Sequence, residues 1–174
     1  MNALSPDLMS AIGTSALIAL ATLLVVAAIS DIRARRIPNA LCLAIAALSP
    51  VYWWAQPVAF VPTLAFQAAL ALVILIVFGL FWTLGWLGGG DVKLKVATAL
   101  WLPLAPLMNM LLWMAMAGAT LSLVVWAAHK RWPERTDKRV PYGVAIAFGG
   151  LAVVGKPILN ALSAITAGPG ATGL

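Results

Sequence analysis

Hydrophobic residues form six long runs along the chain, separated by short polar or turn-forming links. One crossing of a lipid bilayer needs about 20 apolar residues in a helix, and most of these runs approach that length. Trp53 and Trp54 close the second run, as expected of anchors at a membrane interface. We predict six transmembrane helices over residues 12–30, 40–55, 63–87, 92–104, 108–128 and 141–159, and a flexible tail over residues 160–174.

The composition indicates a membrane protein. Of the 174 residues, 63% are hydrophobic and 9% are charged, and the mean hydropathy is +1.02. A soluble domain is about 45–50% apolar and about 25% charged. The composition therefore excludes a water-soluble globular protein, a disordered chain and a nucleic-acid-binding module. We expect an all-α bundle of about six transmembrane helices, a single domain over residues 1–174, surrounded by membrane lipid and without a nucleic acid partner.

The basic residues predict how the helices are oriented. All but one of the 11 Lys and Arg lie in the links after the first, third and fifth runs, and the exception is Lys156. Basic links tend to stay in the cytoplasm, so both termini are expected outside it. This alternation requires the short run at 92–104 to cross the membrane. The first ten residues lack the basic segment of a signal peptide, so the first run is expected to be a retained helix.

Two acids, Asp31 and Asp91, each lie beside an apolar run that contains no other acid. An acid next to the membrane is costly and is a candidate functional residue. The predicted topology places both at the same face of the membrane, where two packed helices would bring their carboxyls together. Such a pair shares one proton, so that the ionised carboxyl can activate water while the protonated one polarises a carbonyl group.

An alternative is that both acids are merely ion-pair partners of neighbouring bases. Asp31 precedes three arginines, and Asp91 precedes Lys93 and Lys95. Composition and spacing alone do not choose between an ion-paired structure and a catalytic pair. A metal centre is not expected, because Cys42 and His129 are the only Cys and His in the chain. No cofactor is expected either.

Three ordered segments extend the pattern around the acids: SDIRARRIPN at 30–39, GGGDVKL at 88–94 and VPYGVAI at 140–146. Together they resemble the type IV prepilin peptidase family of GxGD intramembrane aspartyl proteases. The match is closest to the short form associated with tight-adherence (Flp) pili, and it covers roughly residues 28–150.

The resemblance implies an endopeptidase that cleaves the leader peptide of type IV or Flp-type prepilins at the cytoplasmic face of the bacterial inner membrane. Asp31 and Asp91 fall on the catalytic aspartates of the family. Prepilins would be the substrates and the pilus assembly machinery a further partner. The long form of the family carries an extra segment with two Cys-x-x-Cys pairs and methylates the new N-terminus. Here the link is too short and Cys42 stands alone, so no N-methyltransferase activity is expected.

Further residues near the acids are candidates for supporting the site or binding substrate. Asn39 suits the N-cap of the second helix, behind Pro38. The glycines at 88–90 are expected to break the chain between helices, and they would also leave backbone free to pair with an extended substrate. Lys93 is either part of the site or a lysine reaching the interface. The full set is Pro38, Asn39, Gly88, Gly89, Gly90, Lys93, Pro141, Tyr142 and Gly143.

Pro141 suits the first position of the sixth helix and would place Tyr142 and Gly143 at the level of the acids.

Two other functions compete with the peptidase. One is a small proton-coupled transporter. Two observations count against it: both acids lie at one face of the membrane, and no internal repeat is evident. The other is a noncatalytic subunit for pilus assembly, whose aspartates only form ion pairs.

Overall fold

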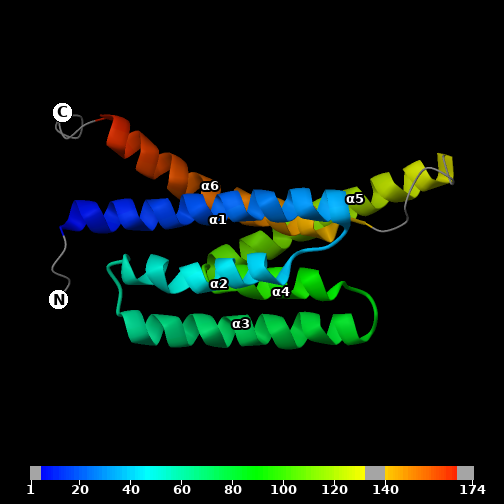
Figure 1. The fold of residues 1–174 in the computed structure, drawn as a ribbon, viewed down its shortest axis with the longest axis horizontal. Helices are drawn as coiled ribbons and strands as arrows, with labels where there is room; N and C mark the ends of the chain where they lie inside the picture. The colour runs from blue at the N-terminus through cyan, green and yellow to red at the C-terminus, as the bar shows by residue number, and fades with distance from the viewer. Residues whose placement is uncertain (1–4, 132–139, 168–174) are drawn as a thin grey trace.

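The structure is a computed structural model that describes residues 5–131 and 140–167. Within these ranges the chain forms helices joined by turns, without strands, which confirms the all-helical prediction. Figure 1 shows α2 and α4 in one row between α1 and α3, with α5 and α6 behind α1. The helices are α1 (Pro6–Ala34), α2 (Asn39–Trp54), α3 (Phe60–Thr83), α4 (Gly89–Ala99), α5 (Leu104–Arg131) and α6 (Tyr142–Ala167).

Four of these helices, α1, α3, α5 and α6, are long and apolar enough to cross a membrane. The protein is therefore a multi-pass membrane protein. The α2 helix has 16 residues and α4 has 11. At about 1.5 Å per residue, α4 is ~16 Å long, about half the ~30 Å thickness of the hydrocarbon core. Each predicted run corresponds to a helix, but six crossings and the side on which the termini lie stay predictions.

Three helices, α1, α5 and α6, extend beyond their predicted ends. The backbone N–H of Arg35 bonds to the Asp31 carbonyl at 2.9 Å, and Arg35 adopts the left-handed conformation of a C-cap, with φ 52°. Asp31 thus lies in the last turn of α1 and not in the link that follows. Residues 160–167, predicted to be part of a flexible tail, are helical because their Ala- and Leu-rich sequence favours continuing α6. Residues 168–174 lie outside the described ranges.

Two tryptophans hold α2 against the end of α4. Trp53 Nε1 donates to the Leu100 carbonyl at 2.8 Å, and Trp101 Nε1 donates to the Ile45 carbonyl at 2.8 Å. Both indoles are buried, so the prediction that Trp53 anchors at the membrane interface is wrong. The carbonyl of Leu100, at the C-cap of α4, needed a donor that the helix itself does not supply.

Adjacent glycines allow α6 to pack closely against two helices. A Cβ atom on Gly149 would lie 2.6 Å from the Met110 carbonyl oxygen of α5. One on Gly150 would lie 2.7 Å from a methyl group of Leu24 in α1. Small residues are the usual means by which membrane helices approach each other this closely. The packing fixes α6 beside α1, so the first turn of α6 lies beside the last turn of α1.

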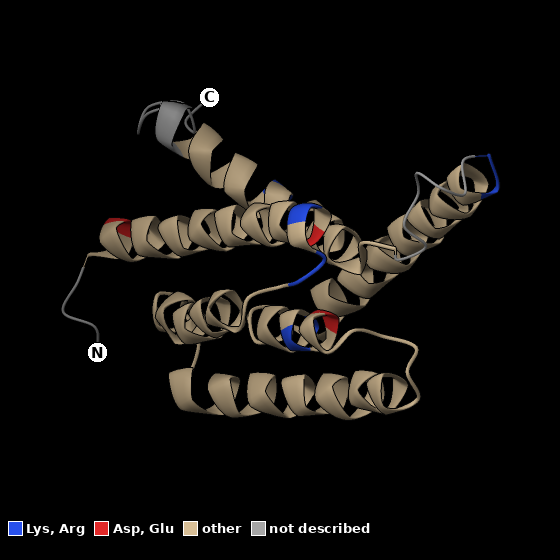
Figure 2. Ribbon diagram, turned by 45° about the vertical axis from the view of Figure 1, so that its right-hand side comes forward, with Lys and Arg blue, Asp and Glu red and all other residues tan. Residues whose placement is uncertain are grey.

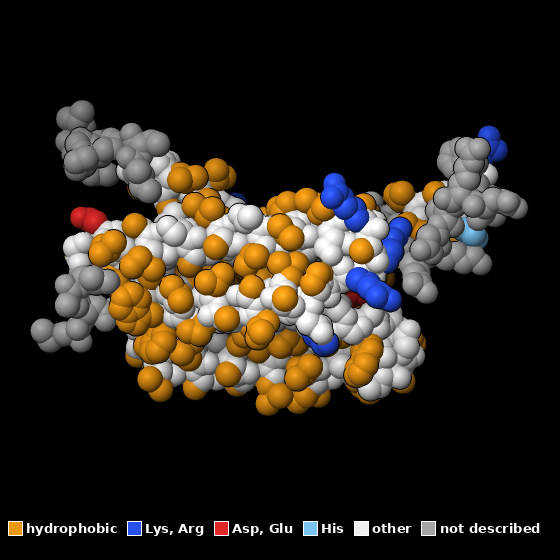
Figure 3. All heavy atoms as spheres, viewed as in Figure 1, with side chains coloured by type: hydrophobic (Ala, Val, Ile, Leu, Met, Phe, Trp, Pro, Cys, Tyr) orange, Lys and Arg blue, Asp and Glu red, His pale blue; other side chains and the backbone are white. Residues whose placement is uncertain are grey.

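The described charges are concentrated at one end of the bundle, where α1 ends, α4 begins and α5 ends (Figure 2). The first turn of α1 and the last turn of α6 lie at the opposite end (Figure 1). Apolar side chains cover the flanks between the two ends (Figure 3), as expected for a surface that faces lipid. The end that carries the bases also carries Asp31 and Asp91.

Candidate active site

Asp31 is fixed by the first turn of α6. Its side chain is buried, and Oδ2 accepts a hydrogen bond of 2.7 Å from the backbone N–H of Gly143. The first N–H groups of a helix have no partner within the helix, and the helix dipole favours negative charge there. A Cβ on Gly143 would lie 2.8 Å from Oδ2 and 2.9 Å from the Cβ of Asp31. Position 143 therefore requires glycine, because a side chain would occupy the place of the carboxyl.

Asp91 lies in the first turn of α4, which begins at Gly89 with Gly88 as its N-cap. The prediction that the three glycines interrupt the helix is therefore wrong for Gly89 and Gly90, which are helical. Gly85, with φ +76°, supplies the turn before α4 instead. Gly88 and Gly89 allow close packing: a Cβ on Gly88 would lie 3.1 Å from Asp91 Oδ2, and one on Gly89 would lie 3.3 Å from Trp82 Nε1.

Asp31 and Asp91 line the same cavity, which has a volume of about 610 Å³. Burial raises the pKa of Asp91 from 3.8 to about 6. The attraction of Lys95 and a hydrogen bond from Gly88 lower this pKa, and the charge of Asp31 raises it. The charge of Asp31 thus reaches Asp91, and both carboxyls line one cavity.

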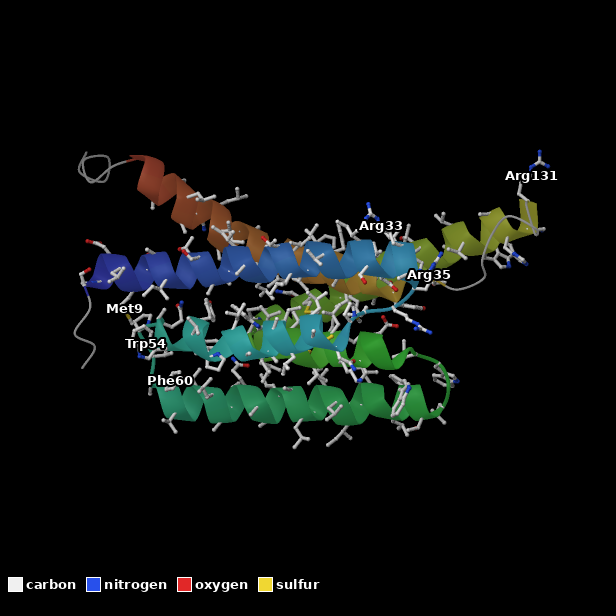
Figure 4. The ribbon with its side chains drawn as sticks, in the orientation of Figure 1. Met9, Arg33, Arg35, Trp54, Phe60 and Arg131 are labelled. Atoms are coloured by element: carbon white, nitrogen blue, oxygen red, sulfur yellow. The ribbon has the colours of Figure 1, made fainter. Side chains whose placement is uncertain are left out.

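The structure supports neither of the two proposed ion pairs of Asp91. Lys93 is exposed and its Nζ donates to Asn39 Oδ1 at 3.0 Å, which ties α4 to the start of α2. Lys95 Nζ lies over the ring of Phe78, 4.5 Å from its centroid. On the other side of the cavity, the charge of Arg35 attracts the carboxyl of Asp31. Figure 4 shows Arg33 directed away from the other helices and Arg35 at the end of α1.

Two predicted helix starts are displaced by one residue. The N-cap of α2 is Pro38 and not Asn39, because Pro38 has the extended conformation of a cap. The amide of Asn39 is then free to accept from Lys93. Pro141 precedes α6, which begins at Tyr142, and its carbonyl accepts from the N–H of Val144 at 3.2 Å. Tyr142 packs on Gly118 of α5, where a Cβ would lie 3.2 Å from its ring.

Most of the candidate residues surround one cavity. Those lining it are Asp31, Asn39, Gly88, Gly89, Gly90, Asp91 and Tyr142, whereas Pro38, Lys93, Pro141 and Gly143 flank these residues. The sequence analysis did not identify Trp86, Ile37, Arg35 and Arg36 as lining residues. Within the described ranges, no three His, Cys, Asp or Glu side chains are placed to hold a metal ion. The arrangement therefore offers two carboxyls as its reactive groups.

Comparison with known proteins identifies one family. The model of the type IV leader peptidase family matches residues 18–123, a segment that includes Asp31 and Asp91. A search of curated proteins and a search of solved structures each found no match.

Proposed function

The chain belongs to the type IV leader peptidase family, and on that premise we propose that it is an aspartyl endopeptidase whose catalytic pair is Asp31 and Asp91. Membership supports a protease of the prepilin leader peptidase type, with prepilins as the class of substrate, and confirms the family suggested by the three motifs. The catalytic mechanism, the Flp subtype and the inner-membrane location are part of the proposal.

The observation that carries the proposal is that two aspartates from different helices line one cavity. They are separated by 60 positions in the sequence, yet the charge of Asp31 acts on Asp91, and burial raises the pKa of Asp91 to about 6. A carboxyl with a pKa near neutrality exchanges a proton readily at the pH of a cell.

In the proposed reaction, the pair carries one proton. The ionised carboxyl removes a proton from water while the oxygen of that water attacks the scissile carbonyl, which the protonated carboxyl polarises. The pair then returns a proton to the amide nitrogen as the carbon–nitrogen bond breaks. The Gly143 N–H orients Asp31 by occupying its Oδ2. The pair ends the cycle with the single proton that it had at the start.

The substrate is proposed to be the leader region of a prepilin, bound at the end of the bundle where the bases gather. If this end faces the cytoplasm, cleavage occurs at the cytoplasmic face of the bacterial inner membrane. Backbone pairing with an extended substrate is proposed for Gly88 alone, because Gly89 and Gly90 are helical. The short link between α1 and α2 leaves no room for the segment of the methylating long form, so the chain is proposed to be of the Flp type without methyltransferase activity.

The two rival functions are less well supported by the geometry. A proton-coupled transporter would need its acids along a path through the membrane, but both lie at one end of the bundle. A noncatalytic subunit would hold its acids through bases alone, but Lys93 bonds to Asn39, and Asp31 also accepts from the backbone of Gly143.

The test is cleavage of prepilins from the same genome by the purified protein in detergent, followed by mass spectrometry. Asp31→Asn and Asp91→Asn keep the size of the side chain but cannot transfer the proton, so each is expected to reduce cleavage about a thousandfold or more, and the double variant hardly further. Asp7→Asn, an exposed acid at the opposite end of α1, is the matched control and should cleave normally. Robust cleavage by folded Asp91→Asn protein would refute the proposed mechanism.

A further inference from the structure

Lys95 is a buried cation that the mechanism above does not use. Its side chain is 2% exposed, within a helix whose other buried residues are apolar or small. It follows Asp91 by four positions and therefore lies one turn further along the same face of α4, in the order that favours attraction between an acid and a base. Burying a charge is costly unless something stabilises it, so this lysine needs a physical explanation.

The ammonium group of Lys95 is stabilised in a way that leaves its charge unneutralised. Nζ lies 4.5 Å from the centroid of the Phe78 ring in α3, a cation–π contact that favours the charged form. Lys95 also lines a second cavity of about 420 Å³, next to the first: both cavities are lined by Trp86, Leu87 and Tyr142. Because the ring carries no charge, the positive field of Lys95 extends to Asp91.

The other ionisable groups around Asp91 come from three directions. The end of α1 and the link after it contribute Asp31, Arg35 and Arg36, α2 contributes Cys42, and α6 contributes Tyr142. On α4 itself, Lys93 is exposed and bonded to Asn39. The α3 helix has no ionisable side chain. Among the bases, Lys95 is the one whose charge acts on Asp91, while Arg35 acts on Asp31.

Burial distinguishes these two bases. Lys95 is enclosed by protein, whereas Arg35 is only partly buried and in contact with solvent. Water and salt screen the field of an exposed charge much more than that of a buried one. The field of Lys95 at Asp91 is therefore screened less than the field of Arg35 at Asp31. The hydrogen bond from Gly143 adds a second stabilisation of negative charge at Asp31.

We propose that Lys95 is a positioning residue of the active site, whose buried positive charge offsets the burial of Asp91 and so lets this carboxyl release its proton near neutral pH. This role rests on the proposed function. Without the lysine, burial and the neighbouring carboxyl would both favour a protonated Asp91. Asp91 would then hold its proton at the pH at which the pair has to exchange it.

The experiment is a titration of the full chain in detergent micelles, labelled with ¹³C at the aspartate carboxyls and followed by NMR. The signal of Asp91 is identified by its loss in Asp91→Asn. Lys95→Met keeps an apolar stem and removes the charge. In this variant the titration midpoint of Asp91, the pH at which half of its carboxyl is protonated, is expected to rise by about one pH unit. Lys95→Arg keeps the charge and should keep the midpoint. Lys156→Met removes an exposed charge on α6 and serves as the control for net charge.

The rate of prepilin cleavage supplies the second readout. In Lys95→Met, the limb of the kcat/KM profile that reports the ionisation of Asp91 is expected to move to higher pH by the same amount, with KM unchanged. A merely structural lysine would instead reduce the rate equally at every pH. If Lys95→Met does not fold, Lys95→Gln takes its place with the same expectation.

The outcomes separate the two proposals. An Asp91 midpoint in the charge-removing variant equal to that of the wild type would overturn the role of Lys95, even if the wild type cleaves prepilins. A second outcome is that the titration midpoint of Asp91 rises in Lys95→Met while the wild type cleaves no prepilin at any pH. That outcome would count against the proposed function and leave the electrostatic role of Lys95 standing.

Discussion

Gly143→Ala is the substitution that most directly tests how Asp31 is held. The new Cβ would lie 2.8 Å from Oδ2, 2.9 Å from Cβ and 3.0 Å from Cγ of Asp31. Rotation of the carboxyl relieves only part of this overlap, because the Cβ of Asp31 is attached directly to the backbone of α1. Either the carboxyl or the first turn of α6 must move, and the 2.7 Å hydrogen bond from the N–H of residue 143 is lost or lengthened.

The expected size of the effect follows from two terms. A hydrogen bond to a charged group contributes about 1.5–3 kcal/mol, and overpacking costs about 1–3 kcal/mol, so the free energy of unfolding is expected to fall by about 2.5–6 kcal/mol. A displacement of a catalytic group by ~1 Å reduces the rate about a hundredfold. We therefore expect a folded but less stable protein that cleaves prepilin about a hundredfold more slowly.

The assay is cleavage of a prepilin at saturating and at low concentration, alongside a thermal melt in the same detergent. Gly155→Ala is the matched control, because Gly155 lies on the same helix and a Cβ there would meet nothing within 4 Å. This control should melt at the same temperature or higher and cleave normally. Wild-type cleavage and melting of Gly143→Ala would refute the argument that the first turn of α6 positions Asp31.

Two further predictions concern pH and topology. The pKa of Asp91 is raised from 3.8 to about 6, so its contribution to stability is fully present below about pH 4 and is lost as the pH rises through 6. Thermal stability should therefore be greater at pH 5 than at pH 7.5, by about 1.4 kcal/mol, and this difference should shrink in Asp91→Asn; an unchanged difference would contradict the assigned pKa. In a Cys42→Ser background, single cysteines near Gln56 should react with an impermeant thiol reagent in intact cells, while those near Arg35 should not; the reverse pattern would place the cavity outside the cytoplasm.

The sequence was sufficient to predict the positions of the helices along the chain, because hydrophobicity alone determines where they lie in a membrane protein. Each of the six apolar runs contains a helix. The ends of the helices were less predictable, since they depend on local bonds. Asn39 suits an N-cap by residue type, but Lys93 takes its side chain as an acceptor and Pro38 occupies the cap. The short length of α4 was also not evident, because apolar residues continue past its end.

The candidate site was partly predictable for a similar reason. Acids are rare in such a chain, so Asp31 and Asp91 were conspicuous, and the alternation of charges placed them at one end. The partner of Asp31 was not predictable, because the N–H that binds it belongs to a residue 112 positions away. The conformational role of Gly85 was hidden by the more conspicuous glycines at 88–90. Lys95 was grouped with the bases of the cytoplasmic link, and only its burial separates it from Lys93.

Both carboxyls of the site lie beside the N-terminus of a helix, which explains how two acids are tolerated in one cavity. Asp91 is in the first turn of α4, and Asp31 accepts from the first turn of α6. The positive ends of these helices stabilise negative charge, whereas burial and the second carboxyl oppose it. Burial outweighs the opposing effects at Asp91, but only in part, since the pKa rises from 3.8 to about 6 and not above neutrality. The short α4 helix contributes to this balance, because it begins at the cavity and thus brings a helix terminus, Asp91 and Lys95 to the same place.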